Sequence, residues 1–229
     1  MVAGIGCSSR LVGYVDFCTL HGTHGRAPAF ATGLKMARPE LHVVVVTGDG
    51  DGLAIGANHL IHAARRNIDI TVLLLNNSIY GMTGGQAAPT TPTGAVASTT
   101  PGGNTEPNFD ACKLLIGAGA SFVARVLAAN PIEMTRVMVE GMTHSGFSFI
   151  EVVSDCPEYY GRYNGMGGGA DMLTWMAGRE VGVTGPLSSK RFVNHVPSST
   201  APPGMATGII QREERPVFTG VHGEGSHGP

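Results

Sequence analysis

Two short polar segments contain the residue types of a metal–phosphate site. They are residues 48–52, Gly-Asp-Gly-Asp-Gly, and residues 76–77, Asn-Asn. Glycines let main-chain N–H groups approach a ligand closely, and the start of a following helix attracts phosphate. Because the two carboxylates would repel a bare diphosphate, a Mg²⁺ ion is expected between carboxylate and phosphate. Taken alone, the first loop also suits a dinucleotide fold or a tight turn with solvated aspartates.

Hydrophobic runs precede both segments and predict the strands that position them. A run over 41–46 leads into the glycine-rich loop, and a run over 70–75 leads into the two asparagines. Unbroken runs of this kind are typical of strands covered on both faces. Helical spacing over 54–66 completes a strand–helix–strand unit, which implies a parallel sheet. Ligands of such sheets bind beyond the carboxyl ends of the strands, where both polar segments are expected.

The rest of the chain continues this alternation. Helices are predicted over 27–38 and 131–144, and strands over 122–126 and 147–153. We therefore predict an α/β fold with a doubly wound, mostly parallel sheet. The long loop over 78–109 is interpreted as functional, because structureless loops of that length are uncommon in compact domains.

Composition excludes several classes of protein. Lys plus Arg is 15 and Asp plus Glu is 17 among the 229 residues, a formal net charge of −2, so no nucleic-acid-binding face is expected. Charged residues are only 14%, against about 25% in ordinary soluble domains, so partners are expected to cover part of the surface. No apolar run suits a membrane span and no signal peptide is recognised. A cytoplasmic location without membrane contact is expected.

Longer motifs resemble a known family. Gly-Asp-Gly followed at a distance by Asn-Asn resembles the thiamine diphosphate motif, and five segments resemble the β subunit of 2-oxoacid:ferredoxin oxidoreductases, especially the 2-oxoglutarate-type branch. They are 5–10 (Ile-Gly-Cys-Ser-Ser-Arg), 21–26 (His-Gly-Thr-His-Gly-Arg), 48–51 (Gly-Asp-Gly-Asp), 58–67 (Asn-His-Leu-Ile-His-Ala-Ala-Arg-Arg-Asn) and 79–86 (Ile-Tyr-Gly-Met-Thr-Gly-Gly-Gln). The resemblance covers about residues 2–175.

The resemblance implies a set of site residues. The side chains of Asp49 and Asn77 and the carbonyl of Ile79 would ligate Mg²⁺. His24 and Arg26 would be the catalytic candidates, facing cofactor and substrate, since an arginine fork binds carboxylates bidentately. Without the resemblance, helix capping and a surface ion pair would be the favoured roles of both. The implied cofactor-binding residues are Gly6, Cys7, Ser8, His24, Gly25, Arg26, Gly50, Asp51, Gly81 and Met82.

The family's β subunit also holds a [4Fe–4S] cluster on four cysteines. Cys7 and Cys156 match two of its ligands, whereas the Cys-Pro-Gly-Cys segment of the other two is absent from this sequence. Two cysteines cannot hold such a cluster alone, so either the chain is truncated at its amino end, which we favour, or the cluster is lost. We predict that Cys7 and Cys156 lie within about 10 Å of each other, beside an open face. Cys18 and Cys112 match no ligand position and are expected to be buried thiols, and no disulfides are expected.

The resemblance implies a β subunit that binds thiamine diphosphate and Mg²⁺ for the coenzyme A-dependent oxidative decarboxylation of a 2-oxoacid. 2-Oxoglutarate is favoured, although Gly84 stands where some relatives have lysine, which leaves branched-chain and aromatic 2-oxoacids open. Electrons would pass to ferredoxin, an α subunit would carry the pyrimidine-binding module, and γ and δ subunits are further possible partners. The alternatives are a non-catalytic or cluster-less thiamine diphosphate-binding subunit and an iron-free thiamine-dependent decarboxylase or synthase.

Two regions are expected along the chain. Residues 1–175 would form the thiamine diphosphate-binding domain, and residues 176–229 a carboxy-terminal extension or arm that is partly irregular. Residues 197–229 are rich in Pro, Gly, Ser and His, with one short ordered segment expected over 208–212.

Overall fold

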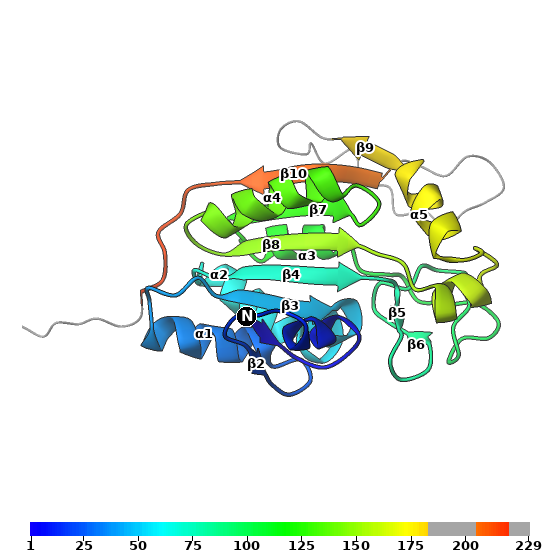
Figure 1. Ribbon diagram of the computed structural model, residues 1–229, viewed down its shortest axis with the longest axis horizontal. Helices are drawn as coiled ribbons and strands as arrows, with labels where there is room; N and C mark the ends of the chain where they lie inside the picture. The colour runs from blue at the N-terminus through cyan, green and yellow to red at the C-terminus, as the bar shows by residue number, and fades with distance from the viewer. Residues whose placement is uncertain (183–204, 220–229) are drawn as a thin grey trace, which may run out of the picture.

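A computed structural model describes residues 1–182 and 205–219. Its main feature is one eight-stranded sheet in the order β2-β1-β3-β4-β8-β7-β10-β9 (Figure 1). Neighbouring strands from β2 to β7 are parallel, whereas β10 is antiparallel to β7. The predicted doubly wound, mostly parallel α/β sheet is therefore confirmed. The strands are β1 (Val2–Ala3), β2 (Leu20–His21), β3 (Val44–Gly48), β4 (Thr71–Asn76), β7 (Phe122–Leu127), β8 (Ser148–Val153), β9 (Glu180–Gly182) and β10 (Met205–Arg212).

Helices cover both faces of this sheet. Residues of α1, α2 and α3 share one buried cluster with Val45 and Val72, and α4 packs on the opposite face with Val46 and Leu73. Because neighbouring strand residues point to opposite faces, continuous apolar runs are required where both faces are buried. Figure 1 shows α4 in front of the sheet at β7 and α3 behind the sheet at β8. The helices are α1 (Ala27–Ala37), α2 (Ala57–Arg65), α3 (Ala111–Gly117), α4 (Pro131–Thr143) and α5 (Gly169–Ala177).

Three short helical turns and a hairpin lie near the ends of the central strands. They are η1 (Ser8–Gly13), η2 (Asp51–Ile55), η3 (Pro157–Gly161) and the antiparallel pair β5 (Ile79–Tyr80) and β6 (Gln86–Ala87). The hairpin begins the long loop that the sequence marked as functional. The strands β3, β4 and β8 all point toward the hairpin in Figure 1.

The single helix expected over 54–66 is divided into η2 and α2. The Gly56 N–H donates to the carbonyl of Asp51 at 3.1 Å, which closes a wide π-type turn before α2 begins. A Cβ added at Gly56 would lie 2.5 Å from that carbonyl oxygen, so a larger residue would not fit. Turns of this type occur frequently at functional sites.

The carboxy-terminal residues that the structure describes join the sheet. The short segment expected over 208–212 forms part of β10, which pairs with β7, and the amide of Asn67 donates to the carbonyls of Arg215 and Pro216. Much of the arm expected over 176–229 lies outside the described residues, and its division from the first region stays a prediction. No helix in the described part of the chain combines the length and apolarity needed to cross a membrane.

Candidate functional site

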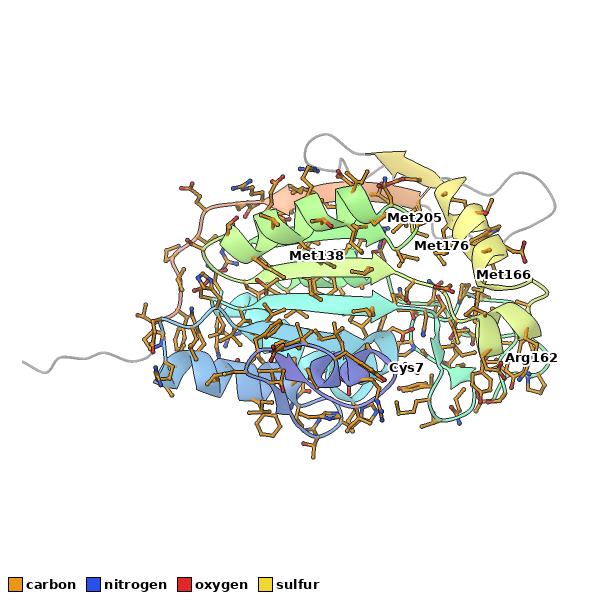
Figure 2. The ribbon with its side chains drawn as sticks, in the orientation of Figure 1. Cys7, Met138, Arg162, Met166, Met176 and Met205 are labelled. Atoms are coloured by element: carbon orange, nitrogen blue, oxygen red, sulfur yellow. The ribbon has the colours of Figure 1, made fainter. Side chains whose placement is uncertain are left out.

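The carboxyl edge of the parallel strands brings the two predicted polar segments together. Gly48 at the end of β3 pairs with Leu75 of β4, and Asn76 at the end of β4 pairs with Val153 of β8. The segments that follow these strands therefore start side by side. Figure 2 shows Cys7, which follows β1, on the same side of the molecule toward which β3 and β4 point.

Asp49 is the buried carboxylate at this edge, with 3% of its surface exposed. Its oxygens accept hydrogen bonds from the Thr90 hydroxyl at 2.5 Å and from the Gly50 N–H at 2.9 Å. Burial raises the pKa of Asp49 to about 6, although Thr90 and the main chain of Gly50 and Ser78 oppose that rise. Because these donors are neutral, a bound cation would supply the positive charge that a buried carboxylate needs.

The segment after β4 forms two successive asparagine turns. The Asn76 side-chain oxygen accepts the Ser78 N–H at 3.0 Å, and the Asn77 side-chain oxygen accepts the Ile79 N–H at 3.3 Å. The Thr91 hydroxyl donates to the Ser78 carbonyl at 2.6 Å. Asn77 and Ile79, the predicted metal ligands of this segment, thus flank Ser78. A main-chain hydrogen bond from Ser78 opposes the rise in the pKa of Asp49. The structure brings the three predicted Mg²⁺ ligands to one place, and their role stays a prediction.

Asp51 has a different environment from Asp49. Its Oδ1 accepts hydrogen bonds from the N–H groups of Ile5 at 3.2 Å and Gly25 at 2.7 Å and from His24 Nδ1 at 2.5 Å. Its Oδ2 accepts from the Thr47 hydroxyl at 2.7 Å. The carboxylate is therefore occupied by protein donors from three segments. If Asp51 contacts a diphosphate, the main chain of Asp51 would have to make that contact.

His24 and Arg26 lie in the segment between β2 and α1. The His24 side chain is 40% exposed, and its ring meets the edge of Tyr80 with ring centroids 6.5 Å apart. Arg26 immediately precedes α1 without a capping hydrogen bond from its side chain, and its guanidinium donates to the Ile55 carbonyl at 3.2 Å. Capping by the side chain, one of the two roles favoured without the resemblance, is therefore not what Arg26 does. The other role was a surface ion pair, and His24 Nδ1 lies 2.5 Å from the buried Asp51 carboxylate.

Tyr80 covers the glycine-rich loop and was not singled out from the sequence. Its hydroxyl donates to the Gly50 carbonyl at 3.1 Å, and a Cβ added at Gly50 would lie 2.2 Å from the ring. Burial raises the pKa of Tyr80, and the carboxylates of Asp49 and Asp51 raise it further. The sequence signal for Tyr80 was its place in segment 79–86, which resembles the family.

Cys7 and Cys156 are neighbours although they are far apart in sequence. A Cβ added at Gly81 would lie 3.2 Å from the Cys7 sulfur and 3.6 Å from the Cys156 sulfur, so the predicted separation below about 10 Å is confirmed. Burial raises the pKa of Cys7, with the Cys156 thiol adding to the effect. Cys156 is buried and Cys7 is exposed, so the pair opens to the surface. In residues 1–182 and 205–219 no group of three or more His, Cys, Asp or Glu side chains could hold a metal ion.

The other two cysteines differ from each other. Cys112 is buried, as expected, and its thiol lies 3.3 Å from a carboxylate oxygen of Glu151. Cys18 was expected to be buried and is exposed, which corrects that prediction. Cys18 belongs to the irregular segment between η1 and β2, where its carbonyl accepts a hydrogen bond from the amino terminus. The neighbouring residues from Asp16 to Leu20 are exposed as well, so this segment lies on the surface. All four cysteines are free.

The remaining predicted cofactor-binding residues line the same edge. Gly6 and Ser8 follow β1, and Gly81 and Met82 form the turn between β5 and β6. The Ser8 hydroxyl oxygen is buried without a hydrogen-bond partner, and a Cβ added at Gly48 would lie 3.2 Å from it. A buried hydroxyl without a partner is costly, so a ligand at the end of β3 would satisfy it. The polar atoms of this edge therefore fit a bound metal–diphosphate group.

Comparisons with known proteins agree with this geometry. Residues 4–152 match the family described as thiamine pyrophosphate enzyme, C-terminal TPP binding domain. The 2-oxoglutarate synthase subunit KorB of Methanocaldococcus jannaschii is 58% identical over 175 residues, which cover 76% of this chain and 65% of that protein. The subunit of the same name from Archaeoglobus fulgidus is 60% identical over 159 residues, which cover 69% of this chain and 60% of that protein. The chain thus spans less than two thirds of the length of these relatives.

A solved structure is similar over nearly the whole chain. It is the 2-oxoglutarate:ferredoxin oxidoreductase from Magnetococcus marinus, solved with 2-oxoglutarate, coenzyme A and succinyl-CoA bound. The TM-score is 0.80 at 32% sequence identity, and the match covers 95% of this chain and 72% of that one.

Proposed function

The chain belongs to the thiamine pyrophosphate enzymes, within the family of 2-oxoacid:ferredoxin oxidoreductase β subunits, and on this premise we propose that it is the β subunit of a 2-oxoglutarate:ferredoxin oxidoreductase. In this function the complex decarboxylates 2-oxoglutarate oxidatively, transfers the acyl group to coenzyme A and passes the electrons to ferredoxin. The single structural observation that supports the proposal most directly is the buried Asp49 carboxylate, which has only neutral donors and lies beside the turn of Asn77.

The proposed cofactor site uses oxygen atoms of three residues. The Asp49 carboxylate, the Asn77 side-chain oxygen and the Ile79 carbonyl would hold Mg²⁺, which prefers oxygen ligands and binds phosphate together with protein carboxylates. Main-chain groups of Gly50 and Asp51, with Gly81 and Met82 of the hairpin turn, would hold the diphosphate. Thiamine diphosphate, when bound, supplies the carbanion that attacks a 2-oxo carbon.

The substrate side of the site is assigned to the segment before α1. Arg26 would bind a substrate carboxylate, because its guanidinium carries five N–H donors in a fixed fork. Its contacts with the carbonyls of His24 and Ile55 do not use all of these donors. His24 is held by its Nδ1 on Asp51, which leaves Nε2 to meet cofactor or substrate. Gly6, Cys7, Ser8 and Gly25 would line the cofactor beside these two residues.

The proposal includes partner subunits. Large apolar side chains are exposed on the amino-terminal part of the chain, and surfaces of this kind mark interaction sites. An α subunit carrying the pyrimidine-binding module would cover them, and γ and δ subunits would complete the complex. The exposed residues are Leu11, Tyr14, Phe17, Leu20 and Phe30.

Electron transfer through an iron–sulfur cluster would need more ligands than the described residues bring together. Cys7 and Cys156 would supply two thiolates to a [4Fe–4S] cluster, but the described residues do not fill the ligand set of such a cluster. We therefore propose the cluster only on the condition that another polypeptide segment supplies its remaining ligands. Free thiols at all four cysteines suit a cytoplasmic location, where thiols are kept reduced.

The deciding experiment is an assay of the reconstituted complex with a panel of 2-oxoacids, coenzyme A and a dye acceptor. We expect dye reduction that depends on 2-oxoglutarate and coenzyme A together. Cofactor binding without any 2-oxoacid-dependent reduction would assign the chain to a non-catalytic or cluster-less subunit. Release of CO₂ without coenzyme A and without iron would instead indicate an iron-free decarboxylase or synthase.

A further inference from the structure

A strained residue stands at the centre of the proposed magnesium turn. Ser78 has a φ of +62°, and among the described residues other than glycine only Asn67 shares a positive φ. Side chains disfavour this left-handed conformation, and asparagine tolerates it better than serine. Because Ser78 separates Asn77 from Ile79, its conformation sets how the side chain of one and the carbonyl of the other are presented. Strained residues persist only where their surroundings hold them.

Two side chains hold Ser78 in this conformation. The Asn76 side-chain oxygen accepts the Ser78 N–H at 3.0 Å, and the Thr91 hydroxyl donates to the Ser78 carbonyl at 2.6 Å. Both main-chain polar groups of Ser78 are therefore bound by neighbours. The Thr91 contact comes from the long loop, whereas the Asn76 contact comes from the last residue of β4.

The orientation of the Asn76 amide depends on Glu151. The Asn76 Nδ2 donates to Glu151 Oε1 at 2.7 Å, while its Oδ1 faces Ser78. An ionised carboxylate only accepts hydrogen bonds. A flipped amide would place oxygen against the Glu151 carboxylate and N–H against the Ser78 N–H. Glu151 therefore determines that the acceptor end of Asn76 meets Ser78.

Glu151 is itself fixed as a carboxylate inside the sheet. It lies on the central strand β8 with 2% of its surface exposed, and Arg125 Nε donates to its Oε2 at 2.6 Å. Burial tends to raise the pKa of Glu151, but the Arg125 charge and hydrogen bonds from Asn76, Arg125 and Cys112 outweigh that tendency and lower it. A buried ion pair contributes little net stability compared with apolar residues of similar size, so stability alone does not account for this one.

From this chain of contacts we propose that Glu151 and Asn76 are positioning residues, which hold Ser78 left-handed and so present Asn77 and Ile79 to the Mg²⁺ of the diphosphate site. The inference rests on the proposed function for the identity of the bound group. It goes beyond that function because it assigns a role to two residues that would not touch metal, cofactor or substrate.

The test uses glycine, which adopts positive φ without strain. In the full chain, Asn76→Ala should weaken Mg²⁺-dependent thiamine diphosphate binding, measured by calorimetry, by about tenfold to a hundredfold. Ser78→Gly alone should bind at least as tightly as the parent chain. Adding Ser78→Gly to Asn76→Ala should restore most of the lost affinity, and it should do the same for Glu151→Gln.

Ser148→Ala is the matched control. The Ser148 hydroxyl is also buried on β8 and donates to the Gly141 carbonyl at 2.7 Å, but it lies at the opposite end of the strand. This variant should lose stability without losing affinity, and Ser78→Gly should not alter its binding. Hydrogen exchange at the Ser78 amide of the ligand-free chain gives a second readout, which Asn76→Ala should accelerate.

The outcomes separate the two proposals. Equal losses of affinity in Asn76→Ala with and without Ser78→Gly would overturn the positioning role, as would unchanged affinity in Asn76→Ala. A parent chain without Mg²⁺-dependent binding would overturn the proposed function instead. In that case the positioning role is tested only by hydrogen exchange at the Ser78 amide. An unchanged exchange rate in Asn76→Ala would overturn that role.

Discussion

At the scale of single residues, two aspartates two positions apart have opposite roles. The Asp51 carboxylate accepts hydrogen bonds from three segments of the chain, so it holds the edge of the sheet together. The Asp49 carboxylate is equally buried, but its donors are neutral and few. A buried carboxylate of the second kind costs stability unless a cation joins it, which is the behaviour expected of a metal ligand.

We therefore predict opposite effects of Asp49→Asn on binding and on stability. Mg²⁺-dependent thiamine diphosphate binding should be largely lost in calorimetry. In the ligand-free chain at pH 7, the unfolding free energy should rise by up to about 3 kcal/mol, because the variant removes a carboxylate whose pKa is raised to about 6.

The sign of the pH dependence follows from this raised pKa. An acid with a raised pKa in the folded state lowers stability as pH rises through the window between the unfolded and folded pKa values. The stability difference between Asp49→Asn and the parent should be complete above about pH 6 and vanish below about pH 4. Urea unfolding across this pH range measures the stability difference. A difference that does not change with pH would contradict the prediction.

Asp51→Asn should mainly destabilise the fold. An amide offers one acceptor oxygen and places N–H groups against donors, so we expect a loss of about 2–4 kcal/mol in unfolding free energy. Asp171→Asn is the control, because Asp171 accepts the Gly168 N–H at an exposed position. This variant should lose little unfolding free energy. Urea titrations compare the two, and equal small losses would show that the Asp51 contacts are not needed for stability.

At the scale of elements, the hairpin of β5 and β6 packs onto the loop after β3. Gly50 has helical main-chain angles, with φ −66° and ψ −38°, so space rather than conformation demands glycine there. The Tyr80 ring occupies the position that a side chain would need.

Gly50→Ala should therefore displace Tyr80 and cost about 1–3 kcal/mol in stability. Binding of Mg²⁺–thiamine diphosphate should weaken with it, because the displaced ring borders both aspartates. Combining Gly50→Ala with Tyr80→Ala should remove the clash, so the double variant should lose less than the sum of the two single losses. Strictly additive losses would show that the contact between the two residues is unimportant.

The network of Glu151 and Arg125 joins neighbouring strands and α3. Arg125 on β7 binds both Glu151 on β8 and Asp110, the residue before α3. Glu151→Gln should lower the unfolding free energy by about 3 kcal/mol at neutral pH, because Arg125 loses a buried partner.

The ionised Glu151 carboxylate should contribute to stability with the opposite sign from the ionised Asp49 carboxylate. The pKa of Glu151 is lowered in the folded state, so its contribution is complete above its unfolded pKa and is lost as pH falls through the folded value. The difference between variant and parent should therefore narrow in acid. Urea unfolding from neutral to acid pH tests this, and a difference that widens in acid would contradict it.

At the scale of the whole molecule, the segment that follows Cys7 and Ser8 of the candidate site exposes large apolar side chains. Tyr14 is 77% exposed and Phe17 is 59% exposed, which is unusual for large apolar groups on a surface without partners. This arrangement suits a subunit whose active site is completed by another chain.

The isolated chain is therefore expected to show no 2-oxoacid-dependent dye reduction, and activity should appear only when the proposed α subunit is added. Phe17→Asp should weaken association of the two subunits at least tenfold, because burying the new charge is costly. Analytical ultracentrifugation measures association, and Asp16→Asn, an exposed neighbour, serves as control. Turnover by the isolated chain would contradict this prediction.

The strands β3, β4, β7 and β8 and the helices α1, α2 and α4 were predicted from the sequence in their observed order, whereas α3, α5 and most of the short strands were not. The run over 70–75 predicted β4 at Thr71–Asn76, and the pattern over 131–144 predicted α4 at Pro131–Thr143, because periodicity and helix-ending residues act locally. Short strands such as β1 carry too few residues for a periodic signal. The neighbourhood of Cys7 and Cys156 was also predictable, since parallel topology sends the ends of all these strands to one edge.

Only the tertiary structure decided which side chains meet within that edge. Asp49 and Asp51 have the same chemistry and the same local sequence, yet their partners come from the long loop in one case and from the segments after β1 and β2 in the other. Asn76 likewise obtains its orientation from Glu151, 75 positions away. Sequence patterns record local preferences, whereas burial and hydrogen-bond partners depend on segments that become neighbours only when the sheet forms.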